Sequence, residues 1–161
     1  MKRIFLASIG FLVLGSIPAL ALDSYSQPGS ITGQLGLGPY WGNGGGFNLQ
    51  AGVDGGLGQI SLARGVPLDL GVAGRAGVFS SAGVDAAAFA TAHFSWKFLG
   101  SKWDWLNRME SYAGLGIQVL PSLSLAGYLG ANFHFDNHWA LFLEASALDY
   151  AGTVIGASYR F

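Results

Sequence analysis

The residues of this 161-residue chain that could do chemistry are few and scattered. His134, Asp136 and His138 are types that bind metal ions, but they flank what reads as a tight turn at a rim. Alternating side-chain directions in the neighbouring strands would separate them. Serine hydrolysis needs a serine, a histidine and an acid that converge, and the expected strand pairing places no histidine beside Ser146 or Ser158. The sequence therefore predicts no metal, no cofactor and no catalytic residue.

The composition points away from an ordinary water-soluble protein. Only 11% of the residues are charged, where about 25% is typical, and 51% are hydrophobic. The formal net charge of -1 offers no basic surface for nucleic acid. The chain has no cysteine, which excludes a disulfide framework and a lipid-modified N-terminal cysteine. A membrane protein or a tightly packed all-β protein fits this composition.

The first 21 residues have the three parts of a secretory signal peptide. Two basic residues at positions 2 and 3 precede the apolar run Ile4–Leu14, and Ala19-Leu20-Ala21 is a small-x-small cleavage site. The apolar run is short for a membrane-spanning helix, which needs about 20 residues. We therefore predict a cleaved signal peptide over residues 1–21 and one mature domain over residues 22–161.

From Val66 onward, apolar residues alternate with polar or small ones, which is the period of a β-strand with two different faces. Within the alternating segments, the charged residues and one histidine share the polar face; they are Asp69, Arg75, Asp85, His93, Lys97, Glu110, Glu144 and Arg160. The rest of this face is mostly small or uncharged, which suits a narrow barrel interior better than a water-exposed surface. An apolar outer face around a polar interior is the arrangement of a transmembrane barrel.

The number of strands depends on the segment Phe47–Arg64. Its alternation is interrupted at Asp54–Gly56, and Ile60 and Leu62 continue on the opposite parity. The segment is either one strand with a glycine bulge or two short strands. Because bacterial single-chain barrels have even strand numbers, we choose one strand. The predicted fold is an all-β, eight-stranded antiparallel up-and-down transmembrane β-barrel.

Aromatic residues gather at one predicted end of this barrel. If both termini lie in the periplasm and the strands run up and down in order, eight aromatic side chains face outward at that end. They are Phe94, Trp96, Phe98, Phe133, Phe135, Trp139, Tyr159 and Phe161. Such a belt is what a barrel needs where it meets the membrane–water interface.

The C-terminal GASYRF, with Phe161 last and Tyr159 two residues before it, resembles the terminal signature of outer-membrane barrels. The stretch Gly130–Tyr150, with its Asp-Asn turn followed by tryptophan, is similar to a hairpin of small barrels of the OmpA, OmpX and OmpW kind, and Tyr112–Val119 resembles another of their strands. The resemblance covers roughly the last third of the chain well. It implies a location in the outer membrane, contact with outer-membrane lipid, and assembly by the outer-membrane insertase, for which Phe161 would be part of the signal.

The expected role is non-enzymatic: a monomeric structural or surface protein of the cell envelope with a polar, largely plugged lumen. Side chains fill the interior of an eight-stranded barrel, and buried charges need partners, so Asp69 is expected opposite His93 and Lys97 beside Glu110. A narrow channel for small solutes or ions is one alternative. A lipid A-modifying barrel enzyme and a soluble secreted β-sandwich are the others.

Overall fold

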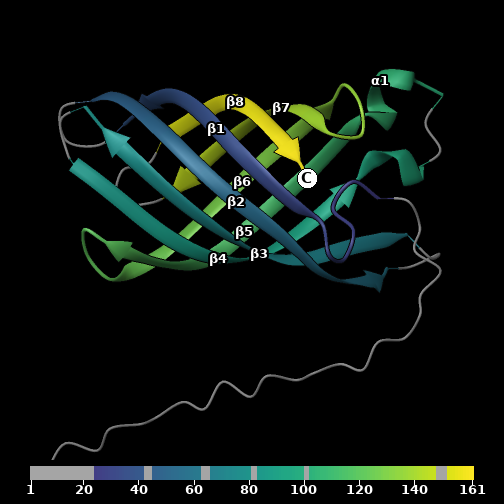
Figure 1. Ribbon diagram of the computed structural model, residues 1–161, viewed down its shortest axis with the longest axis horizontal. Coiled ribbons are helices and arrows are strands. Elements are labelled where there is room, and N and C mark those ends of the chain that lie inside the picture. Colours follow the sequence, from purple (N-terminus) through teal and green to yellow (C-terminus); the bar gives the residue numbers. More distant parts are fainter. Residues whose placement is uncertain (1–23, 42–44, 63–65, 81–82, 100–101, 148–151) are drawn as a thin grey trace, which may run out of the picture.

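Eight antiparallel strands close into one barrel, in which each strand pairs with its neighbours in the chain and the last pairs with the first (Figure 1). The computed structural model describes residues 24–41, 45–62, 66–80, 83–99, 102–147 and 152–161. The strands are β1 (Ile31–Tyr40), β2 (Gly46–Ser61), β3 (Pro67–Phe79), β4 (Gly83–Ser95), β5 (Met109–Leu120), β6 (Ser124–His134), β7 (Trp139–Ala147) and β8 (Gly152–Arg160). The predicted eight-stranded up-and-down barrel is confirmed, whereas the predicted signal peptide over residues 1–21 lies outside the described residues.

Strand β2 is the bulged strand that the sequence predicted. It runs unbroken through the glycine-rich region, and its register against β3 shifts between Gly56 and Gly58. A bulge places one extra residue in a strand and so changes which face the following residues occupy. Ile60 therefore lies exposed on the outside of the barrel. The strand count of eight follows from this bulge.

The barrel is apolar outside, and its interior holds the buried charged and polar side chains together with aromatic ones such as Phe89 and Phe142. On the outside, Leu125 is 83% exposed, and Leu115 and Leu129 are also largely uncovered. Inside, Glu110 and Glu144 are almost fully buried. Side chains alternate between the two faces because successive residues of a strand point in opposite directions. An apolar outer wall of this kind is suited to hydrocarbon rather than to water.

The two ends of the barrel differ. Strand β1 begins and strand β8 ends at one of them, which we call the terminal end, and the connection between β4 and β5 lies there too (Figure 1). This connection contains the 3-10 helix η2 (Trp96–Leu99) and the short helix α1 (Asp104–Asn107). The opposite end, the distal end, carries the β3–β4 and β5–β6 connections. In the described part of the chain, no helix is long and apolar enough to cross a membrane.

Strand β4 is shorter than the sequence predicted. Apolar or small residues occupy the even positions from Val84 to Phe98, a pattern that predicts one strand over the whole segment, but β4 ends at Ser95, where Trp96 begins η2. The Trp96 indole N–H donates a hydrogen bond to Ser111 Oγ at 2.8 Å, which holds the ring against β5. As a result, Trp96, Lys97 and Phe98 lie on the helix and not on the strand.

Candidate functional site

A cluster of charges lies in the middle of the lumen, centred on Arg75 of β3. Arg75 Nη1 donates to Asp54 Oδ2 at 2.9 Å, and Nη2 donates to Glu144 Oε2 at 3.2 Å. The Arg75 guanidinium carbon also lies 4.8 Å from the centroid of the Tyr128 ring. Gln50 Nε2 donates to the other oxygen of Glu144 at 2.7 Å. One planar cation therefore joins β2 to β7 across the barrel interior, which suits a guanidinium better than an ammonium group.

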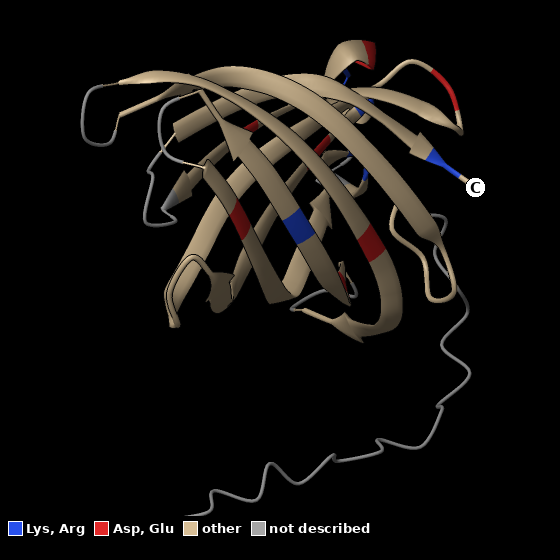
Figure 2. Cartoon of the chain, turned by 60° about the vertical axis from the view of Figure 1, so that its left-hand side comes forward, with Lys and Arg blue, Asp and Glu red and all other residues tan. Residues whose placement is uncertain are grey.

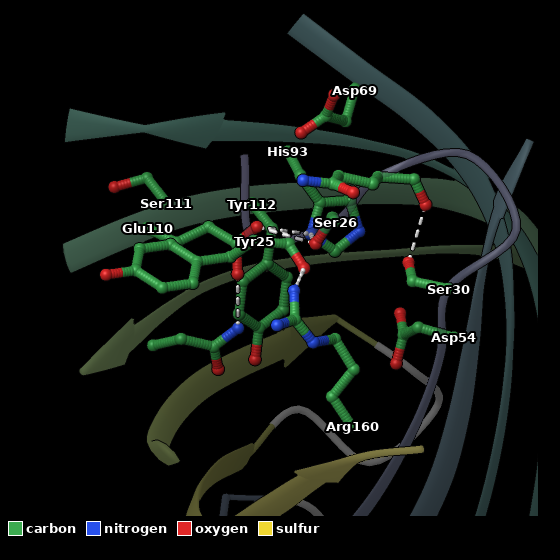
Figure 3. Close-up of polar contacts among 12 residues, drawn as sticks. Tyr25, Ser26, Ser30, Asp54, Asp69, His93, Glu110, Ser111, Tyr112 and Arg160 are labelled. Carbon is green, nitrogen blue, oxygen red and sulfur yellow. Dashed lines mark hydrogen bonds and ion pairs between the residues drawn. The ribbon is translucent and has the colours of Figure 1, made fainter. Parts of the chain in front are cut away.

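A second cluster surrounds Glu110 of β5, nearer the terminal end (Figure 3). Ser26 Oγ donates to Glu110 Oε1 at 2.6 Å, and Asn132 Nδ2 donates to Oε2 at 2.7 Å. His93 Nδ1 lies 3.4 Å from Oε1, and His134 Nε2 lies 3.3 Å from Oε2. Each carboxylate oxygen thus has two polar partners, as a buried carboxylate requires.

The structure brings some of the sequence-predicted lumen residues together and separates others. Asp69 and His93 are register partners on β3 and β4, as expected. Their hydrogen bonds nevertheless differ, because Asp69 accepts one from Gln59 Nε2 at 2.7 Å while His93 turns to the Glu110 cluster. Asp85 is buried on β4 across from Gly77 of β3, two residues along the strand from the position that pairs with Arg75 and far from the Glu110 cluster.

The predicted position of Lys97 beside Glu110 on the polar strand face was wrong. Because β4 ends at Ser95, Lys97 lies on η2, where its Nζ is 4.7 Å from the centroid of the Tyr25 ring. The acid is instead partnered by two histidines, an asparagine and a serine. Arg160 lies at the terminal end of β8, where its Nη1 donates to the backbone oxygen of Tyr25 at 2.8 Å.

The segment Ser24–Ser30 folds back over the mouth of the barrel at the terminal end, and we call it the plug. The Tyr25 ring stacks on His134, with centroids 3.6 Å apart and an interplanar angle of 5°. The Ser26 side chain donates a hydrogen bond to Glu110. The plug backbone is also bonded to β2, because the backbone N–H of Gly29 donates to the backbone oxygen of Gly56 at 2.8 Å. Figure 3 shows Tyr25 and Ser26 between His93, Glu110 and Arg160. The N-terminal segment is thus part of the lumen packing.

Little space is left between the plug and the two clusters. The cavity that they line has a volume of about 20 Å³, and its walls include Asp54, His93, Glu110 and His134. A cavity needs roughly 10–15 Å³ of this kind of volume to hold one water molecule. The cavity therefore has room for about one water and for no larger solute.

Ser26, His93 and Glu110 are the residue types of a hydrolytic triad, but their geometry is different. In a triad the serine and the acid bind opposite nitrogens of the histidine ring. Here Ser26 Oγ and Glu110 Oε1 both face His93 Nδ1, at 3.1 Å and 3.4 Å, and Ser26 itself donates to Glu110. The serine proton is therefore directed to the acid, so this trio is not arranged as a hydrolytic triad.

His134, Asp136 and His138, the three residues around the β6–β7 turn, bind different partners and do not converge. Asp136 Oδ1 accepts the backbone N–H groups of Trp139 and His138, both at 2.7 Å. These two bonds hold the pKa of the Asp136 carboxyl below its usual range. His138 Nδ1 lies 2.8 Å from the backbone oxygen of Arg160, whereas His134 turns into the lumen with its side chain only 13% exposed. Among the described residues, no group of three His, Cys, Asp or Glu is placed to hold a metal ion.

The sequence placed His134 at the rim and missed its role in the lumen, together with Gln50, Asp54 and the plug. Asp54 falls where the alternation is interrupted, so its face could not be read from the pattern. His134 is the last residue of β6 and keeps the inward parity of Asn132, which was the available signal. Nothing in the plug sequence indicates a return into the barrel.

The eight predicted belt aromatics lie at the terminal end, although Trp96 and Phe98 reach it on η2 rather than on a strand. Phe135, Trp139 and Phe161 are at least half exposed. Tyr159 joins two of them, with its ring centroid 4.8 Å from that of Trp139 and 5.1 Å from that of Phe161. Phe133 packs edge-on against Phe135, and Phe94 against Trp96. The aromatic rings thus form contacting groups around this end.

No family model matches this chain, and no curated protein has a matching sequence. Among solved structures, it is similar to a de novo designed transmembrane β-barrel, with a TM-score of 0.60 and 15% identity over 84% of this chain and 98% of that one. It is also similar to the outer membrane protein Ail of Yersinia pestis, in a crystal structure and in a lipid nanodisc. Both of these have a TM-score of 0.42 and 18% identity over 84% of this chain and all of the other. The likeness to the designed barrel shows a shared fold.

Proposed function

We propose that this chain is a non-enzymatic outer-membrane barrel protein with a structural or surface role in the cell envelope, and that its lumen is closed to solutes. The observation that carries the proposal is the filled interior. The Arg75 cluster occupies the middle of the lumen, the plug covers the terminal mouth, and the cavity between them measures about 20 Å³. Buried charges that are fully partnered resist displacement, because separating them would leave unpaired charge in a medium of low dielectric constant.

The outer-membrane location rests on the outer surface and on the sequence. The wall is apolar, one end carries the aromatic groups, and the chain begins with the parts of a signal peptide. The partners that follow are outer-membrane lipid around the wall and the outer-membrane insertase during assembly. The barrel closes on itself without an unpaired strand edge, and we expect a monomer.

Conductance across a planar bilayer tests the closed lumen. We expect the refolded mature protein, residues 22–161, to give no discrete current steps, with a heat-dependent shift on SDS gels as proof that the barrel has folded. A Y25A/S26A variant loosens the plug but leaves the Arg75 cluster in place, so it should also stay silent. Steps from the unaltered protein would contradict the proposal and favour the narrow channel. Steps from the variant alone would show that the plug is the barrier.

A lipid A-modifying enzyme would act on lipid whatever the conductance. Mass spectra of lipid A from cells with and without the protein should be identical under the proposal. A mass change that depends on Ser26 or His93 would overturn it.

Loss of Phe161 should impair assembly more than stability. The ring is 78% exposed, and the backbone N–H of Phe161 donates to Ile31 O at 3.0 Å. Deletion removes one such hydrogen bond, worth about 1 kcal/mol, whereas F161A keeps it. We expect both variants to refold in detergent but to be several-fold depleted in outer-membrane fractions, as measured by immunoblot. Normal outer-membrane levels of either variant would argue against a C-terminal assembly signal.

A further inference from the structure

The basic residues of the mature barrel are distributed unevenly. Apart from Arg75 in the middle of the lumen, the described ones all lie at the terminal end; they are Lys97, Lys102, Arg108 and Arg160. Three of these four belong to the β4–β5 connection, Trp96–Arg108, which contains one acidic residue, Asp104. The connections of the distal end contain no lysine or arginine. Figure 2 shows the blue residues near the C-terminus and α1, with one further blue band on the barrel wall.

The same connection exposes two tryptophans. Trp103 is 63% exposed and Trp105 is 52% exposed, and their rings stack with centroids 6.1 Å apart. Helix α1, which contains Trp105, has no buried residue, and both tryptophan rings leave more than half of their surface uncovered. Exposing so much apolar surface to water is unfavourable, whereas the membrane–water interface is where tryptophan is enriched.

The connection is continuous with the aromatic groups of the barrel wall. Arg108 Nη1 donates to the backbone oxygen of Phe135 at 3.3 Å, which ties it to the β6–β7 turn. At its other end, Trp96 contacts Phe94 of β4 and donates to Ser111 of β5. The segment is thus attached at both ends to strands whose aromatic rings face outward. In transmembrane barrels the turns on the periplasmic side are usually short. The β4–β5 connection is longer than such a turn, which suggests that it has a role beyond joining two strands.

We infer that the described parts of this connection, Trp96–Leu99 and Lys102–Arg108, form a membrane foot that binds the phosphate surface of the phospholipid leaflet at the terminal end. Trp103 and Trp105 enter the interfacial region of the bilayer, and Lys102 and Arg108 pair with lipid phosphates. Each basic residue near an anionic surface contributes about 1 kcal/mol, and the single acid Asp104 leaves the segment with an excess of positive charge. The foot would set how deep the barrel sits and how it is tilted. This inference rests on the proposed membrane location.

Tryptophan fluorescence of the refolded mature protein in vesicles tests the foot. In a W41F/W96F/W139F variant, Trp103 and Trp105 are the remaining tryptophans, so the measured fluorescence comes from them. We expect their emission to move to shorter wavelength in phosphatidylglycerol vesicles and to lose intensity when the acyl chains carry bromine near the headgroup. Bromine near the chain ends should quench less, and acrylamide in the water should quench little. If this background does not fold, the difference between the unaltered protein and W103F/W105F gives the same quantity.

Charge dependence separates the lipid surface from other partners. The shift should be larger in phosphatidylglycerol than in phosphatidylcholine, and K102E/R108E should remove that difference. The matched control K97Q should keep most of it, because Lys97 lies over the Tyr25 ring. If acrylamide still quenches Trp103 and Trp105 strongly in protein that shows a normal heat shift, the membrane foot is contradicted. The proposal that the lumen is closed would not be affected by that result. A shift that appears only with rising protein concentration would overturn it in favour of a contact between copies.

Discussion

Replacing Arg75 by methionine should lower the free energy of unfolding of the barrel by about 3–5 kcal/mol, the usual cost of removing one partner of a buried ion pair. Arg75 separates two buried acids, with its Nη1 2.9 Å from Asp54 and its Nη2 3.2 Å from Glu144. Without it, two carboxylates share a closed space in which no other described cation is paired with them. Urea unfolding in lipid vesicles, followed by tryptophan fluorescence, measures the loss.

Two further variants separate charge from packing. The triple variant R75M/D54N/E144Q removes the whole charge cluster at nearly constant volume, so we expect it to recover most of the lost stability. R75K keeps the charge but has no planar fork with which to reach both acids, so it should recover only part. Equal stability of R75M and the unaltered protein would show that the cluster does not hold the lumen together. Such a result would also weaken the case for a closed interior.

Replacing Gly156 by alanine should cost about 3 kcal/mol, at the upper end of the range for overpacked cores, and should reduce the fraction of protein that folds. Gly156 of β8 is the register partner of Gly36 of β1, at the seam where the barrel closes. A Cβ at Gly156 would meet the Leu35 carbonyl oxygen and would lie 2.7 Å from the Phe142 ring. Backbone at the closing seam cannot move away without opening the barrel.

Gly74 offers the matched control for this substitution. It is also in a strand, but a Cβ there would meet its nearest neighbour, Val53 Cγ1, only at 3.8 Å, which is ordinary contact. G74A should therefore fold with an unchanged heat shift and a free energy of unfolding within about 0.5 kcal/mol of the unaltered protein. Heat-shift gels give the folded fraction of both variants, and urea unfolding gives their stability. If G156A folds as well as G74A, close approach at the seam does not control closure.

The sequence by itself determined the fold because the inside and outside of a strand alternate with a period of two. Asp69, Arg75, Glu110 and Glu144 could be assigned to the interior from their own neighbours in the chain. The strand count needed one more rule, the even number of strands in such barrels, to interpret the interruption at Asp54–Gly56 as a bulge.

Only the tertiary structure decided which interior residues meet. Arg75 pairs with Asp54, 21 residues away, and with Glu144, 69 residues away. Contacts across a lumen depend on the tilt and stagger of all the strands once the sheet has closed, and no local pattern carries that information. The same reason explains why Glu110 is partnered by His134 and Ser26 and not by Lys97. The plug and the Trp103–Trp105 pair belong to segments without strand periodicity, so their positions follow from closure of the barrel and not from their own sequence.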